Sequence, residues 1–158
     1  MKTLHISFLS REDSIGLLTK PVRGLKYEDR ELIDEIVSVT GGQPFLLQAI
    51  ASEIIEMLNL KAERVATKTI VDAAIEEAVL KHGTYFDFLW DQECEGERRK
   101  ALLKIVACNT NTRTTDVVPY EEELRDLVRR ELLWVEGDHI QMTMPILRSW
   151  MRRTQHLL

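Results

Sequence analysis

The side chains that most often carry catalysis or bind metals are present, but no spacing gathers them into a site. No two histidines have the i, i+4 spacing of a helical zinc pair, and no histidine–cysteine cluster occurs. Cys94 and Cys108 lack C-x-x-C spacing and are too few for a disulfide framework, so we expect two free thiols. No G-x-S-x-G nucleophile motif is present. We therefore expect no catalytic residue and no metal site. The four histidines are His5, His82, His139 and His156.

Carboxylates are plentiful, with 26 Asp and Glu residues, but they fall on the expected solvent faces of helices. Glu76 and Glu77 form one such pair. Residues 121–123 are three consecutive glutamates at an expected helix N-terminus, where negative charge is favourable. We interpret both groups as solvated helix surface.

Nucleotide hydrolysis needs a phosphate-binding loop, and the chain has none. The G-x-x-x-x-G-K-[ST] motif does not occur, and none of the seven glycines is followed by lysine. Without that loop and its lysine, the chain should not hydrolyse a nucleotide by itself. We therefore expect that it is not an enzyme.

One short run can be interpreted either as a helix corner or as a binding element: Thr40-Gly41-Gly42-Gln43-Pro44. Gly41 follows an apolar-periodic segment, where a left-handed residue commonly ends a helix. Pro44 stands where a first-turn proline is favoured, because its missing N–H would be unpaired in any case. The run predicts a helix over 28–40 and a second, very apolar helix over 44–58.

Composition places the chain among soluble globular proteins. It has 158 residues, a hydrophobic fraction of 44% and a net charge of −5. The acidic balance disfavours nonspecific binding to nucleic acid or to anionic membranes, although a local basic patch is compatible with it. No apolar run reaches the ~20 residues of a membrane span, and no signal peptide is recognisable. We expect a cytoplasmic protein that does not act at a membrane.

The first half of the chain predicts a helical bundle. Residues 4–9 alternate apolar and polar side chains like a short strand, yet no partner strand follows. Ser10 and Asp13 have the spacing of a helix cap, which predicts a helix to about Thr19. Thr69 and Asp72 have the same spacing and predict a further helix, closed by Gly83.

In the second half, the spacing of apolar residues changes after an aromatic patch over residues 85–90. Core or interdomain packing is the expected role of this patch; a base-stacking platform is disfavoured because no basic residue is interleaved with the aromatics. Apolar spacing then predicts three helices and a β-hairpin. The expected elements are a helix over 97–107, a loop over 108–119, a helix over 120–130, strands over 132–135 and 139–143, and a helix from Pro145.

These elements predict a mainly α fold in two domains. Residues 1–82 would form a helical bundle that includes the strand remnant 4–9. Residues 83–158 would form a winged-helix domain, because helix, loop, helix, β-hairpin and helix follow one another in that order.

The order of these motifs resembles the lid and following winged helix of AAA+-related STAND-type ATPases. The likeness covers most of the chain and is strongest at Thr40-Gly41-Gly42-Gln43-Pro44-Phe45-Leu46-Leu47-Gln48, with a second segment at Met144-Pro145-Ile146-Leu147-Arg148-Ser149-Trp150-Met151. Gly42-Gln43-Pro44 is similar to the G-x-P motif of that family. The resemblance implies that Pro44 packs near an adenine ring, with Gly42 and Gln43 in the same turn.

The same resemblance implies several partners. The nucleotide, ATP or ADP, would be held mainly by a preceding nucleotide-binding domain, and the isolated chain would carry no cofactor. The lid would close on that nucleotide, and the winged helix would relay the change to an effector or partner protein.

A DNA-binding winged-helix regulator is the alternative hypothesis. The helix over 120–130 would then enter the major groove. Its N-terminal end carries the glutamates 121–123, which would face phosphates unfavourably, while Arg125, Arg129 and Arg130 lie further along. Basic residues on the last helix, Arg148, Arg152 and Arg153, offer a second basic face. A free-standing enzyme is a third hypothesis that no constellation of residues supports.

Overall fold

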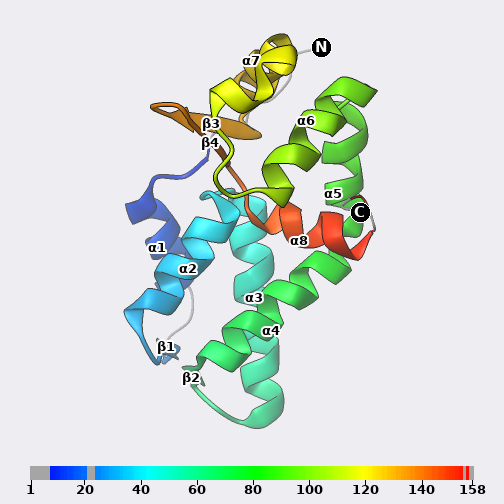
Figure 1. Ribbon diagram of the computed structural model, residues 1–158. Coiled ribbons are helices and arrows are strands. Elements are labelled where there is room, and N and C mark those ends of the chain that lie inside the picture. The colour runs from blue at the N-terminus through cyan, green and yellow to red at the C-terminus, as the bar shows by residue number, and fades with distance from the viewer. Residues whose placement is uncertain (1–7, 21–23, 155, 157–158) are drawn as a thin grey trace, which may run out of the picture. The chain divides into compact units, whose positions relative to one another are not determined.

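The computed structural model describes residues 8–20, 24–154 and 156, and it is mainly helical (Figure 1). The chain divides into two compact units, Met1–Lys81 and His82–Leu158. Most of the expected strand over 4–9 lies outside the described residues; Phe8 and Leu9 are described and have no regular secondary structure. No helix in the described ranges is long and apolar enough to cross a bilayer.

The described residues of the first unit form four helices and one pair of very short parallel strands. The strands pair Lys26 with Val65 and Tyr27 with Ala66. The elements are α1 (Arg11–Thr19), β1 (Lys26–Tyr27), α2 (Arg30–Thr40), α3 (Pro44–Lys61), β2 (Val65–Ala66) and α4 (Lys68–Lys81).

Helix α3 is the centre of this unit because apolar residues cover most of its surface. It packs against α1, α2 and α4. Each fully buried Leu or Ile contributes about 1.5–3 kcal/mol relative to an exposed one. Glu53 is a buried carboxylate of the same helix, and Lys81 compensates its charge from α4 at 3.0 Å. Fully buried α3 side chains include Leu46, Leu47, Ile50 and Ile54.

The predicted N-cap of α1, C-cap of α2 and first-turn proline of α3 are confirmed, but the predicted cap of α4 is wrong. The Ser10 side chain accepts a hydrogen bond from the Asp13 N–H, and Gly41 ends α2 in the left-handed conformation. Helix α4, however, begins at Lys68, and it is the Thr67 hydroxyl that accepts from the Ile70 N–H at 3.4 Å. Threonines two residues apart offer competing caps, and the short β1–β2 pair, which ends at Ala66, favours the earlier one.

In the second unit, the described residues form four further α-helices and an antiparallel hairpin. Gly83 begins the first of these helices instead of closing α4. The elements are α5 (Gly83–Phe88), a π-helical turn η1 (Leu89–Glu93), α6 (Glu97–Cys108), a 3₁₀ helix η2 (Thr114–Tyr120), α7 (Glu121–Arg129), β3 (Leu133–Glu136), β4 (His139–Met142) and α8 (Ile146–Arg153).

The hairpin is confirmed, and it gains one extra pairing. Leu133 faces Met142 at one end of the β3–β4 ladder, and Glu136 faces His139 at the other. Arg113 forms an isolated antiparallel bridge with His139. The expected loop over 108–119 is wrong in its second half, which is η2. Asp116 accepts a hydrogen bond from the Arg113 N–H at 2.9 Å and begins that helical turn, a short-range cap hidden in a polar segment.

The aromatic patch is divided between core and surface. Phe86 and Trp90 are buried against Trp150 of α8, with ring centroids 6.0 and 6.2 Å away. This agrees with the expected packing role. Phe88 differs, because 54% of it is exposed.

The two cysteines differ in exposure, so their labelling tests the packing of the second unit around Cys94. Burial, together with the nearby charge of Glu93, raises the pKa of the Cys94 thiol to about 12, whereas Cys108 is exposed. At pH 8 only on the order of one Cys94 thiol in 10,000 would be the reactive thiolate. We predict that a thiol reagent labels one cysteine in the native protein and two in urea. The Cys108→Ser variant should label only after unfolding; rapid native labelling of that variant would contradict the packing around Cys94.

Candidate functional site

The corner between α2 and α3 is built from two consecutive glycines with positive φ. Gly41 has φ 63° and donates its N–H to the Ser38 carbonyl. Gly42 has φ 81° and donates its N–H to the Thr40 hydroxyl at 3.3 Å. The Gln43 N–H then donates to the Thr40 carbonyl at 3.1 Å. Each of the three N–H groups of this turn is therefore already bonded within the protein.

Gln43 and Pro44 begin α3. The Gln43 side-chain oxygen accepts a hydrogen bond from the Leu46 N–H at 3.0 Å, so it caps the helix. Pro44 occupies the first turn, as predicted, and is partly exposed. Phe45 beside it is 41% exposed. Among the residues proposed from the sequence, Gly42 is buried, Gln43 is engaged as a cap, and Pro44 offers apolar ring surface.

The corner is fastened to the segment that precedes α1. The Leu9 N–H donates to the Gly42 carbonyl at 2.8 Å. A Cβ atom placed on Gly42 would lie 2.5 Å from the Leu9 carbonyl oxygen, closer than real Cβ contacts allow. Positive φ and this close approach both require glycine. No side-chain pattern in the sequence points to Leu9, because it makes this contact through its backbone N–H and carbonyl oxygen.

Ser14 of α1 is a second residue that the sequence did not reveal. Its hydroxyl is fully buried and has no hydrogen-bond partner among the described residues. The same hydroxyl would lie 3.2 Å from a Cβ on Gly42. A buried hydroxyl without a partner costs about 1–3 kcal/mol. The corner thus contains one polar atom whose presence the fold of this unit does not explain.

The chemistry available at the corner is narrow. The backbone N–H groups of the turn are bonded and the Gln43 side-chain oxygen serves as a cap, so the turn does not offer the unbonded backbone N–H groups with which glycine-rich loops hold a phosphate. No group of three or more His, Cys, Asp or Glu side chains in the described part of the chain could hold a metal ion. What remains is apolar contact at Pro44 and Phe45, which suits the face of a flat ring.

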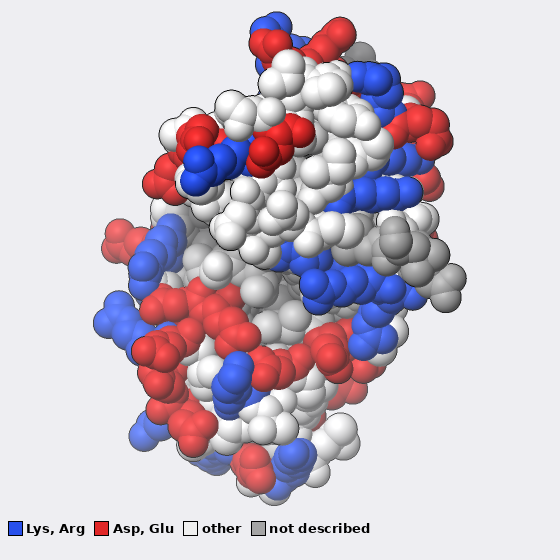
Figure 2. All heavy atoms as spheres, in the orientation of Figure 1, with Lys and Arg blue, Asp and Glu red and all other residues white. Residues whose placement is uncertain are grey.

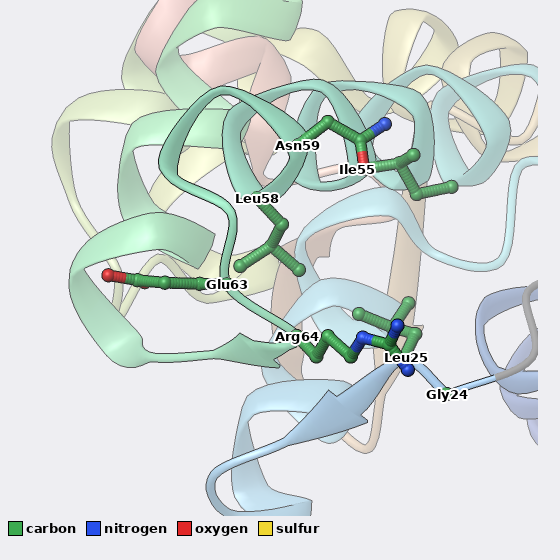
Figure 3. Close-up of a pocket in the computed structure, with 7 residues that line it drawn as sticks. All are labelled: Gly24, Leu25, Ile55, Leu58, Asn59, Glu63 and Arg64. Atoms are coloured by element: carbon green, nitrogen blue, oxygen red, sulfur yellow. The ribbon is translucent and has the colours of Figure 1, made fainter.

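A pocket of the first unit lies away from this corner. A pocket of about 230 Å³ lies at the far end of α3, roughly 20 Å from Pro44 at 1.5 Å per residue (Figure 3). Arg64 extends beside Leu25 toward Gly24, and Glu63 points away from them. The pocket therefore does not contribute to the corner. Its lining residues are Gly24, Leu25, Ile55, Leu58, Asn59, Glu63 and Arg64.

The arginines of α7, proposed from the sequence for DNA recognition, are engaged by carboxylates. Arg125 lies 2.7 Å from Glu121, and Arg129 lies 3.7 Å from Asp126. Arg130, directly after the helix, lies 3.2 Å from Glu93.

Two further pairs join α6 to α7. Arg98 pairs with Glu123 and Arg99 with Asp126, and hydrogen bonds from these arginines lower the pKa of both carboxylates. The exposed face of α7 is therefore a network of both charges and offers no uncompensated positive edge to a DNA groove.

Comparison with protein-family models, with curated proteins and with solved structures found no match to this chain.

The Gly42 contact makes a quantitative prediction. Gly42→Ala should destabilise the first unit by roughly 2–4 kcal/mol, because it combines a positive-φ penalty with overpacking against backbone. Gly137→Ala is the matched control: its φ is also positive, at 63°, but a Cβ there meets nothing within 4 Å. The control should cost only about 1 kcal/mol. Urea denaturation measures both values, and equal losses would refute the close approach.

The Ser14 hydroxyl makes a second prediction. Ser14→Ala should leave stability unchanged or raise it by up to about 1 kcal/mol, because it removes an unsatisfied buried polar atom. Thr40→Val is the control. It removes a hydroxyl that donates to the Ile36 carbonyl and accepts from Gly42, so it should cost about 1–2 kcal/mol. If Ser14→Ala is as destabilising as Thr40→Val, then Ser14 has a structural partner.

Proposed function

We propose that this chain is the non-catalytic regulatory region of a signalling ATPase of the AAA+/STAND type. Residues 1–82 act as a lid over a nucleotide, and residues 83–158 act as a winged helix that relays lid movement through protein contacts. The observation that carries the proposal is the fastening of Leu9 to Gly42, 2.8 Å from N to O, directly before the partly exposed Pro44. Leu9 and the start of α3 would therefore move together.

The order of elements in the second unit supports the winged-helix part of the proposal. Helix α6, the bridge at Arg113, the helical turn η2, helix α7 and the β3–β4 hairpin follow one another as they do in winged helices. Such modules serve protein contacts as well as DNA contacts. The ion pairs on α7 favour the former for that helix.

The corner suits contact with the adenine base of a nucleotide and not with its phosphates. ATP or ADP, held by a separate nucleotide-binding domain, would supply a flat adenine face for Pro44. Gly42 would set the path of the turn, and Gln43 would keep the first turn of α3 rigid through its bond to the Leu46 N–H. A lid that touches the nucleotide at one turn shifts its open–closed equilibrium only by the difference in contact between the two states.

In this proposal the 158 residues carry out no catalytic step. Phosphate binding, magnesium and water activation would belong to the nucleotide-binding domain. We place the protein in the cytoplasm, where Cys94 and Cys108 would remain reduced.

The proposal is tested in two stages. First, the reading frame upstream of Met1, or an adjacent gene, should encode a domain with a G-x-x-x-x-G-K-[ST] loop. If neither does, the proposal is wrong. Second, that domain is combined with this chain, and its affinity for a fluorescent ADP analogue is measured.

In that assembly, Pro44→Ala should weaken ADP binding about fivefold, which corresponds to roughly 1 kcal/mol of lost apolar contact. Pro145→Ala is the matched control, since Pro145 also precedes a helix, α8, but lies in the second unit. It should leave the affinity within twofold of the parent. Equal affinities for all three proteins would show that Pro44 does not touch the nucleotide.

A further inference from the structure

Ten of the eleven Lys and Arg residues of the second unit, all except Arg153, fall into two classes. Six arginines lie within 4 Å of a carboxylate, so their charge is compensated locally. Four other cations have no carboxylate partner among the described residues. The paired residues are Arg98, Arg99, Arg113, Arg125, Arg129 and Arg130. The unpaired ones, which we call the cationic strip, are Lys100, Lys104, Arg148 and Arg152.

Contacts with the core hold the strip in place. The Lys100 and Lys104 ammonium groups lie 5.5 and 5.9 Å from the centre of the Trp90 ring, one helical turn apart on α6. Arg148 of α8 donates its Nε–H to the Ala107 carbonyl at 2.8 Å, which joins α8 to the end of α6. Arg152 follows Arg148 by one turn. Blue side chains gather over α8 on the face shown in Figure 2.

The strip places like charges close together without compensation. Partial burial, and then the charge of Arg152, lower the pKa of the Arg148 guanidinium. The repulsion between these two cations is a cost that an arriving anion would relieve. Elsewhere in the same unit the fold supplies a carboxylate for such arginines, as Asp126 does for Arg99 at 2.9 Å.

We propose that the cationic strip binds the sugar–phosphate backbone of duplex DNA. Its four members are Lys and Arg, the residues that contact phosphates, and the two pairs repeat at one helical turn along α6 and α8. Because Trp90 and the Ala107 carbonyl hold three of the four cations, Lys100, Lys104 and Arg148, these three lose little side-chain entropy on binding.

Two observations separate a duplex from other polyanions. Single-stranded nucleic acid is usually held by exposed aromatic rings, but Trp90 is 5% exposed and lies under both lysines. An acidic peptide needs an apolar groove or an open backbone edge for its affinity, and five pockets of the described residues are lined without any member of the strip. A duplex needs only a row of fixed cations.

The chain's net charge of −5 makes this binding weak and strongly dependent on salt. The contact is independent of sequence, because nothing in the strip reads base edges. It is also independent of the nucleotide contact proposed for Pro44, so Pro44→Ala should leave DNA binding unchanged.

The test uses the full chain and a fluorescein-labelled duplex of random sequence, with anisotropy recorded from low to moderate salt. Lys104→Gln and Arg152→Gln should each weaken binding at low salt by roughly 3- to 10-fold, and the double variant should lower the salt slope by about 2. Arg125→Gln and Arg129→Gln are matched controls on α7 and should bind within twofold of the parent. Circular dichroism melts check that every variant folds.

Three results would overturn the proposal. The first is no binding of the parent chain at low salt, where phosphate contacts are strongest. The second is loss of binding in the α7 variants but not in the strip variants, which would make α7 the DNA-contacting helix. The third is tighter binding of poly-glutamate than of a duplex with the same number of charges, which would make the strip a surface for acidic proteins.

Discussion

The first unit depends on the close approach of Gly42 to Leu9. One hydrogen bond of 2.8 Å, with room for no side chain between the two backbones, ties the residues before α1 to the first turn of α3. Since α3 is the most buried helix of the unit, a shift of that leading segment cannot be absorbed locally. The force on Leu9 passes to Gly42 and then to Pro44, and this coupling makes the corner suitable for a lid.

The same corner limits what the proposed lid could do. Its backbone donors are already used: the N–H groups of Gly41, Gly42 and Gln43 each bond to Ser38 or Thr40. A turn with unbonded N–H groups would attract phosphate, as glycine-rich loops at helix N-termini do. This one presents a proline ring instead. The distinction separates sensing of the nucleotide from its hydrolysis, and it agrees with the lack of any phosphate loop in the sequence.

The features that the sequence predicted well are local. The caps at Ser10 and Gly41, the start of α3 at Pro44 and the β3–β4 hairpin depend on residues within one turn of each other. The errors arose where two local signals compete or where the partner is distant. Thr67 was preferred to Thr69 after the β1–β2 pairing, and Asp116 began a 3₁₀ helix within polar sequence. Leu9 and Gly42 are 33 residues apart in the sequence and make contact through backbone atoms alone, so no side-chain pattern predicts this contact.

In the second unit, the number of basic residues on a helix does not tell which helix would attract an anion. From the sequence, α7 and α8 both present arginines, and α7 holds the position expected to enter a groove. In the fold, the carboxylates of α7 itself and of η1 compensate the α7 arginines, as Glu121 does for Arg125. Lys104 and Arg152 receive no such partner in the described residues, and an unpaired cation keeps most of its attraction for an outside anion. The proposed DNA contact therefore follows the residues that the fold leaves uncompensated, on α6 and α8, and not the helix that the sequence suggested for recognition.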